Sequence, residues 1–505
     1  MNKLASVAFN MTVMKYSFLY ALFYCRCEIP GCDTNETEYN PEWLPNAVPF
    51  KNDRPVKCEK YQHRTGSENQ SCSAADFDTN ITERCDNFVY ETSELTIVND
   101  YDLHCEENLW KLTLVGTINS VGQFVGLPVT GFMSDRYGRR TTLVWGMVLC
   151  GVAGLARSFA TGYVAFVILE FIDAAFGAGA YGCGFILGVE LVGPKKRVLI
   201  STIISCSYAI GEVITGAVAW LIQSWRPLVQ ILYSLPLLLL SYFWLTPESV
   251  RWLLSQKKYT EAITILKKAA KVNGKTISEE NLSKLCSADE KSPEPVKYPL
   301  AAMFKSVVLV MRFINSCFCW ITCAFLFYGL TLNSVALAGN SYLDFILTSL
   351  VEIPGYVATY LIVDRIGRRP SQCGSFLLTS AACIAFIFIP TDMYWLKLSM
   401  YLLGKFGATM AFGVCYIISS EIFPTSLRHS LMATCSMFGR IGSMVAPQMP
   451  LLEQVWAPFP LILFGAMAAI AGLLALLFPE TVNIKLPDTI EEAEQIGKQR
   501  NETKL

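Results

Sequence analysis

Charged residues are scarce in this chain. Asp, Glu, Lys and Arg make up 16% of its 505 residues, whereas a soluble globular protein carries about 25%. Hydrophobic residues account for 52%, and the mean hydropathy is +0.37. They gather in runs of about 20 residues, the length that crosses a bilayer as a helix. This composition excludes a soluble enzyme, a nucleic-acid-binding protein and a disordered scaffold, and makes the lipid bilayer the first expected partner.

Histidine is scarcer still, with three residues in the whole chain. The sequence also has no P-loop and no HExxH motif, which disfavours ATP-driven pumping and metallohydrolase chemistry. No CxxC pair is matched by a second such pair or by a nearby histidine among the 18 cysteines, so a zinc site is set aside. We therefore expect no enzyme activity, no metal and no cofactor.

Apolar runs follow one another from Trp110 onward and contain Gly, small residues or Pro, as membrane helices tolerate. The eleven runs are 110–133, 142–160, 163–190, 198–222, 226–246, 306–330, 341–363, 371–390, 395–418, 430–452 and 459–478. A twelfth candidate, 4–24, is weaker, because Lys15 lies near its middle and a central Lys costs roughly 2.5–3.5 kcal/mol on insertion. We expect an all-α membrane protein whose first span is shortened or displaced.

The polar segment 28–109 has the features of an extracellular loop. It contains 18 acidic and 6 basic residues, and three glycosylation sequons at Asn35, Asn69 and Asn80. Clustered cysteines in a polar segment indicate disulfides formed in an oxidising compartment. We expect the following six to pair, in any of fifteen connectivities: Cys27, Cys32, Cys58, Cys72, Cys85 and Cys105. Cys25 is then left over.

The loops on the other side are basic. Segment 251–305 has 11 basic and 6 acidic residues, and clusters of Arg and Lys follow the first, third and seventh of the eleven runs. If the helices alternate in direction, all these segments lie on one side, which the positive-inside rule assigns to the cytoplasm. We expect a multi-pass plasma-membrane protein with both termini in the cytoplasm if 4–24 spans.

Three signatures occur twice. Asp135-Arg-Tyr-Gly-Arg-Arg returns at Asp364, Glu190 returns at Glu421 and Glu248 at Glu480, with offsets of 229, 231 and 232 residues. Three motifs at nearly one offset indicate two homologous halves, each of six helices if 4–24 counts. We expect a first half at 1–250, a helical cytoplasmic linker at 251–305, a second half at 306–480 and a cytoplasmic tail at 481–505. Two parallel six-helix halves are typical of a rocking transporter.

The D-R-x-G-R-R loops in both halves resemble the major facilitator superfamily. Further motifs over about 28–490 resemble its organic ion transporter branch, which carries cations, anions and carnitine-like zwitterions. These motifs are Pro41-Glu-Trp-Leu followed by Pro49, Pro247-Glu-Ser-Val-Arg-Trp-Leu253, Tyr328-Gly-Leu330, Val351-Glu-Ile-Pro354, Glu421-Ile-Phe-Pro-Thr and Pro479-Glu-Thr481. The resemblance implies two six-helix bundles with a substrate site between them.

Charged residues at the cytoplasmic helix ends are candidates for an inner gate, in which arginines pair with acidic residues and helix termini. The alternative is that they only set the topology, although topology requires neither the duplicated Asp nor the duplicated Gly. The gating candidates are Asp135, Arg136, Arg139, Arg140, Glu190, Arg197, Glu248, Asp364, Arg365, Arg368, Arg369, Glu421, Arg428 and Glu480.

Two charged residues inside apolar runs are the first candidates for substrate binding. Glu352 would bind a cationic group or a coupling proton, or would only pair with a neighbouring helix. Arg440 stands where the resemblance implies Asp in cation carriers and Arg in anion and carnitine carriers. A buried Arg favours a substrate with an anionic group; the alternative is a salt bridge to Glu352 or to the run 163–190.

The run 163–190 departs from the family pattern, because Glu170 stands where an Arg is usual and Asp173 follows. The lost Arg and the two added carboxylates would favour cations or would abolish the usual coupling; together with Arg440 they would suit a zwitterion. Aromatic residues are candidates for a cage around a quaternary ammonium group, or are only packing residues. They are Tyr181, Trp320, Phe325, Phe327 and Tyr328, of which Trp320 and Phe327 match the family's cavity positions best.

The sequence therefore predicts a polyspecific carrier of small organic ions that works by alternating access. A sugar porter is disfavoured by the charges of Glu352 and Arg440. A non-transporting receptor or scaffold stays open because of the weak first span and the altered run 163–190. A homo-oligomer formed through the extracellular loop is a further expectation.

Overall fold

The structure is a computed structural model. It describes residues 25–33, 38–51, 54–64, 72–91, 94–192, 197–275, 277–278, 306–334, 340–390, 392–424, 427–482, 484, 487 and 490–496. Within these ranges, nine helical stretches are long and apolar enough to cross a membrane, if consecutive helices are counted as one stretch. Each of the eleven predicted runs coincides with a helix or with consecutive helices. The candidate span 4–24 lies outside the described residues.

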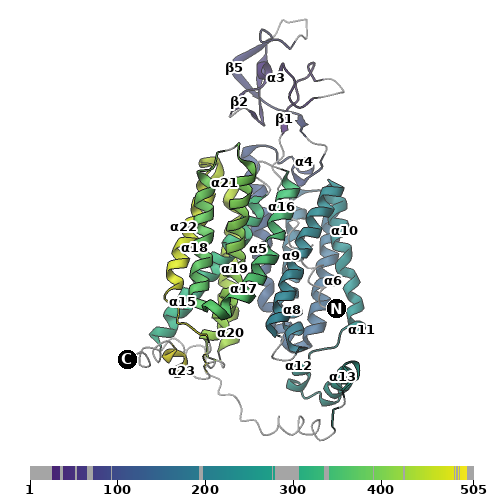
Figure 1. The fold of residues 1–505 in the computed structure, drawn as a ribbon. Coiled ribbons are helices and arrows are strands. Elements are labelled where there is room, and N and C mark those ends of the chain that lie inside the picture. Colours follow the sequence, from purple (N-terminus) through teal and green to yellow (C-terminus); the bar gives the residue numbers. More distant parts are fainter. Residues whose placement is uncertain are drawn as a thin grey trace, which may run out of the picture.

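The helices stand side by side in two groups, which we call the first and second half (Figure 1). The first half contains α5 (Leu109–Tyr137), α6 (Arg139–Ser158), α7 (Tyr163–Gly177), α8 (Ala180–Glu190), α9 (Arg197–Ile222), α10 (Trp225–Leu237), η3 (Leu238–Ser241) and α11 (Tyr242–Leu245). The second half contains α15 (Val307–Asn333), α16 (Ser341–Leu350), α17 (Glu352–Ile366), α18 (Arg368–Ile387), α19 (Tyr394–Ile422), α20 (Arg428–Val445), η6 (Ala446–Gln448), α21 (Met449–Val455) and α22 (Phe459–Ala475). The halves meet where α9 packs on α16 and α17, and where α5 packs on α20.

The predicted span 341–363 is interrupted at one residue, Val351, whose backbone angles stay helical. Helix α16 ends at Leu350 and α17 begins at Glu352. Pro354 stands in the first turn of α17, where it has no N–H to continue the preceding helix and its ring would clash with the carbonyl four residues earlier. Glu352 therefore lies near the middle of the membrane-length stretch Ser341–Ile366.

The predicted spans 163–190 and 226–246 are broken as well. The first divides into α7 and α8 next to Gly179, where a Cβ would collide with the side chain of Thr130 in α5. The second turns into the short helix η3 directly after Pro236. Hydropathy alone does not reveal such breaks, because the apolar run continues through each of them.

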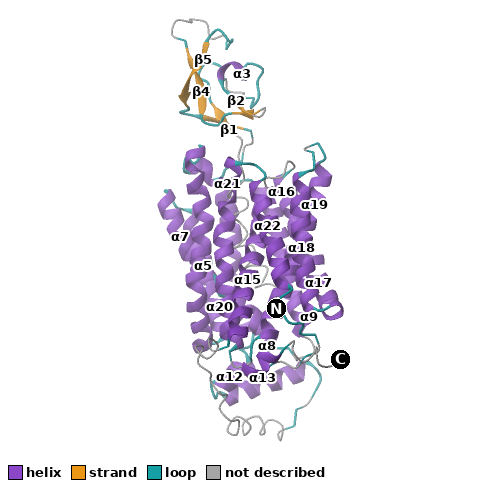
Figure 2. Ribbon diagram, turned by 90° about the vertical axis from the view of Figure 1, so that its left-hand side faces the viewer, coloured by secondary structure: helices purple, strands orange, loops and turns teal. Residues whose placement is uncertain are grey.

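A small disulfide-linked segment lies at one end of the helices, which we call the loop end, and the strands are confined to it (Figure 2). Its elements are β1 (Cys25–Cys27), α3 (Leu44–Ala47), β2 (Phe50–Lys51), β3 (Arg54–Pro55), β4 (Glu59–His63), β5 (Phe77–Arg84), β6 (Phe88–Tyr90), α4 (Ile97–Asp100) and η1 (Glu106–Asn108). The antiparallel pairs are β1 with β6, β2 with β3 and β4 with β5. The disulfides are Cys27–Cys85, Cys32–Cys72 and Cys58–Cys105. The six predicted cysteines therefore all pair, and Cys25 is free and buried.

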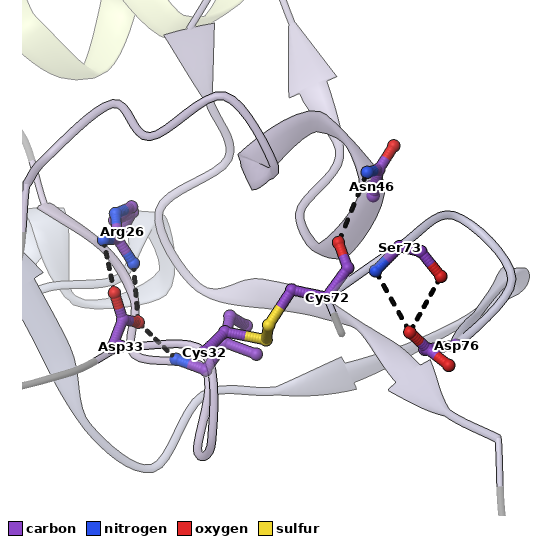
Figure 3. Close-up of a disulfide and its surroundings, with 8 residues drawn as sticks. Arg26, Cys32, Asp33, Asn46, Cys72, Ser73 and Asp76 are labelled. Atoms are coloured by element: carbon purple, nitrogen blue, oxygen red, sulfur yellow. Dashed lines mark hydrogen bonds and ion pairs between the residues drawn. A yellow bond between two sulfur atoms is a disulfide. The ribbon is translucent and has the colours of Figure 1, made fainter. Parts of the chain in front are cut away.

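Arg26 organises the start of this segment (Figure 3). Its guanidinium is fully buried and makes two hydrogen bonds, of 2.9 and 2.7 Å, with the carboxylate of Asp33. It also donates to the backbone carbonyls of Cys27, Glu38 and Tyr39 at 3.0, 2.8 and 2.8 Å. Because all five N–H groups of the guanidinium donate, a buried charge holds three stretches of loop backbone together.

Stability of the loop segment is expected to fall on acidification. His104 is buried against the Phe88 ring, and this burial lowers the pKa of His104 below its ordinary value of 6.5. The unfolded segment then binds a proton more readily than the folded one, so stability is present above about pH 6.5 and is lost as the pH falls below it. Hydrogen exchange of the β1 and β6 amides in the full chain, at pH 7.5 and 5.5, measures this loss. The same pH dependence in His104→Phe would contradict it.

Short helices lie at the opposite end, which we call the linker end (Figures 1 and 2). They are α12 (Val250–Ser255), α13 (Tyr259–Val272) and α23 (Ile490–Gln495). Arg312 of α15 donates to the carbonyls of Ala493 and Ile496 at 2.5 and 2.8 Å, so α23 docks on the second half. Residues 279–305 of the predicted linker lie outside the described residues.

Candidate functional site

Each half has one tight turn at the linker end whose glycine adopts a backbone conformation that other residues rarely adopt. Gly138 joins α5 to α6 with φ of 101°, and Gly367 joins α17 to α18 with φ of 112°. A Cβ on either glycine would also collide with a carboxylate, that of Glu248 in the first half and that of Glu480 in the second. The duplicated glycine of the D-R-x-G-R-R loops therefore serves the backbone, a requirement that topology alone does not impose.

The two carboxylates cap the helices that follow these turns. Glu248 accepts hydrogen bonds of 3.0 and 3.1 Å from the first two backbone N–H groups of α6. Glu480 accepts bonds of 2.9 and 3.2 Å from the first two of α18. Negative charge is favourable at a helix N-terminus, where N–H groups have no intrahelical partner. The same arrangement in both halves confirms that the sequence repeat is a structural repeat.

Arginine side chains complete each network. Arg139 pairs with Asp135 at 2.9 Å and lies 3.9 Å from Glu190. The counterpart distances are 2.9 Å for Arg368–Asp364 and 3.1 Å for Arg368–Glu421. Arg140 donates to the carbonyls of Phe243 and Thr246. Each of these contacts joins residues of the same half.

The other gating candidates are placed differently. Arg136, Arg365 and Arg369 are exposed, although the backbone N–H of Arg369 donates to the capping carboxylate of Glu480. Arg428 donates to the carbonyl of Phe423 at 3.2 Å. Arg197 begins α9, but its side chain lies outside the described part of the chain.

Replacing Gly367 by Ala is expected to destabilise the second half. The φ of 112° and the neighbouring Glu480 carboxylate both oppose a Cβ, and such strained positions cost about 1–3 kcal/mol each. Thermal unfolding of the detergent-purified protein measures the effect. Gly374→Ala is the matched control, because it lies inside α18 with open space at its Cβ position. Equal unfolding temperatures for the two variants would contradict the assignment.

Near mid-height of the helices, two glutamates from different halves come together. Glu352 of α17 pairs with Lys405 of α19 at 2.7 Å, and both side chains are fully buried. Glu212 of α9, also fully buried, lies against Glu352 and beside the hydroxyl of Ser349. Lys405 also donates to Thr331 and to the carbonyl of Phe327 at 2.6 and 3.0 Å. Two carboxyl groups therefore face a single ammonium group.

Arg440 lies on the other side of the same region. It is half-buried and donates to Gln123 of α5 at 2.7 Å, with the Tyr328 hydroxyl at 3.5 Å. Among the described residues it forms no ion pair, so the predicted alternative of a salt bridge to Glu352 is wrong. A guanidinium held by neutral partners is able to bind an anionic group.

Aromatic rings fill the space between these charges. Phe327 and Tyr328 are consecutive residues of α15, and each contacts one of the two charged groups. The Lys405 ammonium lies 3.5 Å from the centre of the Phe327 ring, and the Tyr328 hydroxyl lies 3.5 Å from the Arg440 guanidinium. The rings form a chain of centroid distances between 4.4 and 6.2 Å. Its members are Tyr181, Tyr208, Phe327, Phe412, Tyr416 and Trp320. Phe325 is not among them, because it packs on Phe464 at 4.8 Å. We call these rings, with Tyr328, Glu212, Glu352, Lys405 and Arg440, the central cluster.

Glu170 does not reach the central cluster directly. Its carboxylate pairs with Arg157 of α6, which also lies 3.2 Å from Asp173, and Tyr233 donates to Asp173. All four residues are buried. The positive charge that run 163–190 lacks is thus supplied by a neighbouring helix, and Glu170 is a partner in a buried ion pair rather than a bare carboxylate. Asn119 donates to Glu170 at 3.0 Å and accepts from Gln123 at 2.7 Å, which connects this pair to Arg440.

Polar contacts join the two halves along α5 and α20, from the central cluster toward the loop end. Besides the bond of Arg440 to Gln123, they are Thr113–Gln448 at 3.1 Å, Thr117–Gln448 at 2.5 Å, Thr117 to the Met444 carbonyl at 3.1 Å and Ser120 to the Ser443 carbonyl at 3.0 Å. We call these contacts the polar seam. Together with the packing of α16 on α9, the polar seam closes the halves against each other at the loop end.

Sequence reasoning missed three charged residues of this region. Arg157, Glu212 and Lys405 each lie inside a predicted apolar run. An ionisable residue in a membrane helix is a signal by itself, so all three could have been found by the argument applied to Glu352. Their partners could not, because the sequence does not tell which helices are neighbours.

Residues 102–447 match the model of the Major Facilitator Superfamily. The chain belongs to this superfamily. Within it the chain belongs to solute carrier family 22, because member 3 of that family in mouse is 35% identical over 81% of this chain and 73% of the relative. The organic cation transporter protein of Drosophila melanogaster is 33% identical over 85% of this chain and 82% of the relative. Human member 2 is 32% identical over 94% and 88%.

Solved structures show the same superfamily fold. The xylose transporter XylE of E. coli in an inward-open conformation has a TM-score of 0.60 at 20% identity, covering 77% of this chain and 89% of its own. Its partially occluded inward-open form has a TM-score of 0.65 at 17% identity, covering 96% and 99%. The chain is therefore a multi-pass transporter of small organic ions and not an enzyme, as its resemblance implied.

Proposed function

We propose that the protein carries small organic ions that bear an ammonium group, including zwitterions with a carboxylate, by alternating access of its two halves. The central cluster is the observation that supports this proposal. Two carboxyl groups with one ammonium group leave surplus negative charge at one side, Arg440 supplies positive charge at the other, and aromatic rings lie between them. An ammonium group binds well to carboxylates and aromatic faces.

The relatives support the proposed transport of cations, since one of them is named as an organic cation transporter. Arg440 supports the proposed binding of a carboxylate on the substrate, because no carboxylate of the described residues pairs with it. Phe327 and Tyr328 are adjacent in the chain and contact the two sites, so one small molecule with both charges spans them. In this proposal Tyr181, Trp320, Phe327 and Tyr328 line the substrate, whereas Glu170 acts through Asn119 and Gln123.

For the gating residues we propose a role in keeping each half rigid. The contacts of Asp135, Arg139, Glu190 and Glu248, and those of their second-half counterparts, stay within one half at the linker end. Such units rock as bodies while the contacts between the halves open and close. On the basis of this division we propose the domain limits 1–250, 251–305, 306–480 and 481–505.

We further propose that the loop end is extracellular and the linker end cytoplasmic, in the plasma membrane. The disulfides and the acidic composition of segment 28–109 support the first, and the basic linker supports the second. Asn80 is exposed in β5 and is the glycosylation candidate that lies in the described chain; Asn35 and Asn69 lie outside it. The loop segment extends beyond the helices in Figure 1, which leaves its surface available to a second copy.

Uptake of three labelled probes tests the proposal: a quaternary ammonium cation, a simple carboxylate and carnitine. Full-length protein in proteoliposomes is expected to give saturable counterflow of the cation and of carnitine, and little of the carboxylate. Labelled xylose serves as the sugar-porter control. Transport of xylose alone would favour a sugar porter, and no transport of any probe by folded protein would leave the scaffold alternative.

A further inference from the structure

Two amide side chains of α5 connect the buried ion pair of the first half to Arg440 of the second. Asn119 donates from Nδ2 to the Glu170 carboxylate at 3.0 Å, and Gln123 donates from Nε2 to the Asn119 oxygen at 2.7 Å. The Gln123 oxygen accepts from Nη1 of Arg440 at 2.7 Å. Asn119 and Gln123 are four residues apart and so lie on the same face of α5. Three hydrogen bonds therefore form one chain that ends across the boundary between the halves.

The two ends of this chain fix its direction. The Glu170 carboxylate is paired with Arg157 and is ionised, so it only accepts hydrogen bonds, whereas a guanidinium only donates them. Asn119 must therefore turn its NH₂ group toward Glu170, which leaves its oxygen for Gln123. Gln123 must in turn present its own oxygen to Arg440. Hydrogen bonds that run in one direction polarise one another, so the Gln123 oxygen is a strong and well-directed acceptor.

Close packing of α5 on α7 makes the first bond of the chain possible. A Cβ on Gly122 would lie 2.7 Å from the backbone carbonyl oxygen of Phe171, closer than real Cβ atoms come. The missing side chain lets the two helices approach, and Asn119 then reaches Glu170 with a short side chain. The chain of amides is thus built into the helix packing of the first half.

A second contact sets the register of α5 against α20. Ser120 donates to the backbone carbonyl of Ser443 at 3.0 Å. This carbonyl is open to Ser120 because Pro447, four residues later, has no N–H with which to bond it. Ser120 lies three residues before Gln123, and Ser443 three residues after Arg440. The register therefore places the Gln123 amide opposite the Arg440 guanidinium.

Both contacts of Arg440 lie at one corner of its guanidinium. Nη1 donates to Gln123 at 2.7 Å and lies 3.5 Å from the Tyr328 hydroxyl. Nε and Nη2 have no partner among the described residues, and neither is a fully buried atom. These two atoms form one edge of the planar group, and such an edge binds both oxygens of a carboxylate side by side.

We propose that Gln123 is a positioning residue for the substrate's carboxylate, because it holds the Nη1 corner of Arg440 so that the Nε–Nη2 edge receives both carboxylate oxygens. The inference rests on the proposed carriage of zwitterions and names the residue that sharpens their recognition. A long arginine side chain loses conformational freedom when it binds a ligand, and a fixed corner removes part of that loss in advance. Gln123 is neutral, so it holds the guanidinium without cancelling the charge that attracts the carboxylate.

Transport of carnitine and of carnitine methyl ester by full-length protein in proteoliposomes tests this role. The ratio of their kcat/KM values isolates recognition of the carboxylate. In Gln123→Leu, KM for carnitine is expected to rise about tenfold with kcat retained, the factor that a weak hydrogen bond to a charged group is worth, and the ratio should fall equally. Gln256→Leu makes the same chemical change at an exposed position after α12 and is the matched control.

Gln123→Glu separates positioning from packing. The new side chain has nearly the same shape, but its carboxylate pairs with Arg440 and neutralises it, so the preference for carnitine over the ester is expected to disappear. If Gln123 only packed α5 against α20, Gln123→Glu would keep the preference, and Gln123→Leu would lose both substrates in equal proportion. If Gln123→Leu does not fold, the ratio in Gln123→Glu decides between the two roles.

The outcomes distinguish this inference from the proposed function. A wild type that prefers carnitine, with the same ratio in both Gln123 variants, would overturn the positioning role alone. A wild type that transports both substrates equally well, or neither, would overturn the proposed carboxylate site, and the role of Gln123 would fall with it.

Discussion

Replacing Arg157 by Glu is expected to abolish folded protein. The guanidinium of Arg157 is fully buried and is shared by Glu170 and Asp173. The substitution leaves three carboxylates together without a cation, and breaking a buried ion pair by removal of one partner already costs about 3–5 kcal/mol. This is comparable with the whole stability of many proteins, about 5–15 kcal/mol. Size-exclusion chromatography of detergent extracts and cell-surface abundance both measure the loss.

The control for this prediction exchanges the charges of Arg157 and Glu170. Arg157→Glu combined with Glu170→Arg restores an ion pair between α6 and α7, and is expected to recover much of the folded protein that the single variant loses. Lys268→Glu makes the same charge change at an exposed position of α13 and is expected to fold normally. If the double variant were no better than the single one, the loss would be steric rather than electrostatic, and the ion-pair account would fail.

Glu352→Gln is expected to fold but to lose most of its transport of cations. Lys405 keeps its bonds to Thr331 and the Phe327 carbonyl, and Glu212 stays nearby as a counter-charge. The surplus negative charge of the site is removed, however. Tetraethylammonium has no N–H and is attracted to the carboxylate by charge alone. Two charges about 5 Å apart at an effective dielectric constant of about 20 attract each other by about 3 kcal/mol, so kcat/KM for tetraethylammonium should fall on the order of 100-fold.

The control for this prediction is the amount of protein. Initial rates are normalised to folded transporter in the same vesicles, and Glu261→Gln in α13 is carried in parallel. A Glu352→Gln variant with unchanged kcat/KM for the cation would mean that Glu352 only joins α17 to α19 through Lys405. That is the structural alternative already evident from its position in the sequence.

Much of the architecture is predictable because its signals are local. A run of about 20 apolar residues is a membrane helix wherever it occurs, and the predicted runs coincide with helices throughout the described chain. The duplicated Gly138 and Gly367 stand in two equivalent turns, a role that the repeat did not reveal before the backbone angles were known. The helix breaks at Val351 and Gly179 were missed, because they depend on Pro354 and on the packing of Thr130, which average hydropathy does not register.

The candidate site was predictable in part. Glu352 and Arg440 are charged residues in apolar runs and could be singled out without any structure. Their partners depend on which helices pack together, so the pairing of Glu352 with Lys405 and of Glu170 with Arg157 required coordinates. The disulfide connectivity required them for the same reason, since cysteine spacing alone leaves fifteen possibilities.

The account's central claim is that opposite charges of one substrate are bound by the Glu352 side and by Arg440. Carnitine and carnitine methyl ester share the quaternary ammonium group and differ in the carboxylate, so their relative kcat/KM in proteoliposomes tests the claim directly. The wild type should prefer carnitine by about 10- to 150-fold, and Arg440→Gln should transport both equally well. A preference that survives in Arg440→Gln, or a wild type that transports both equally, would contradict the account.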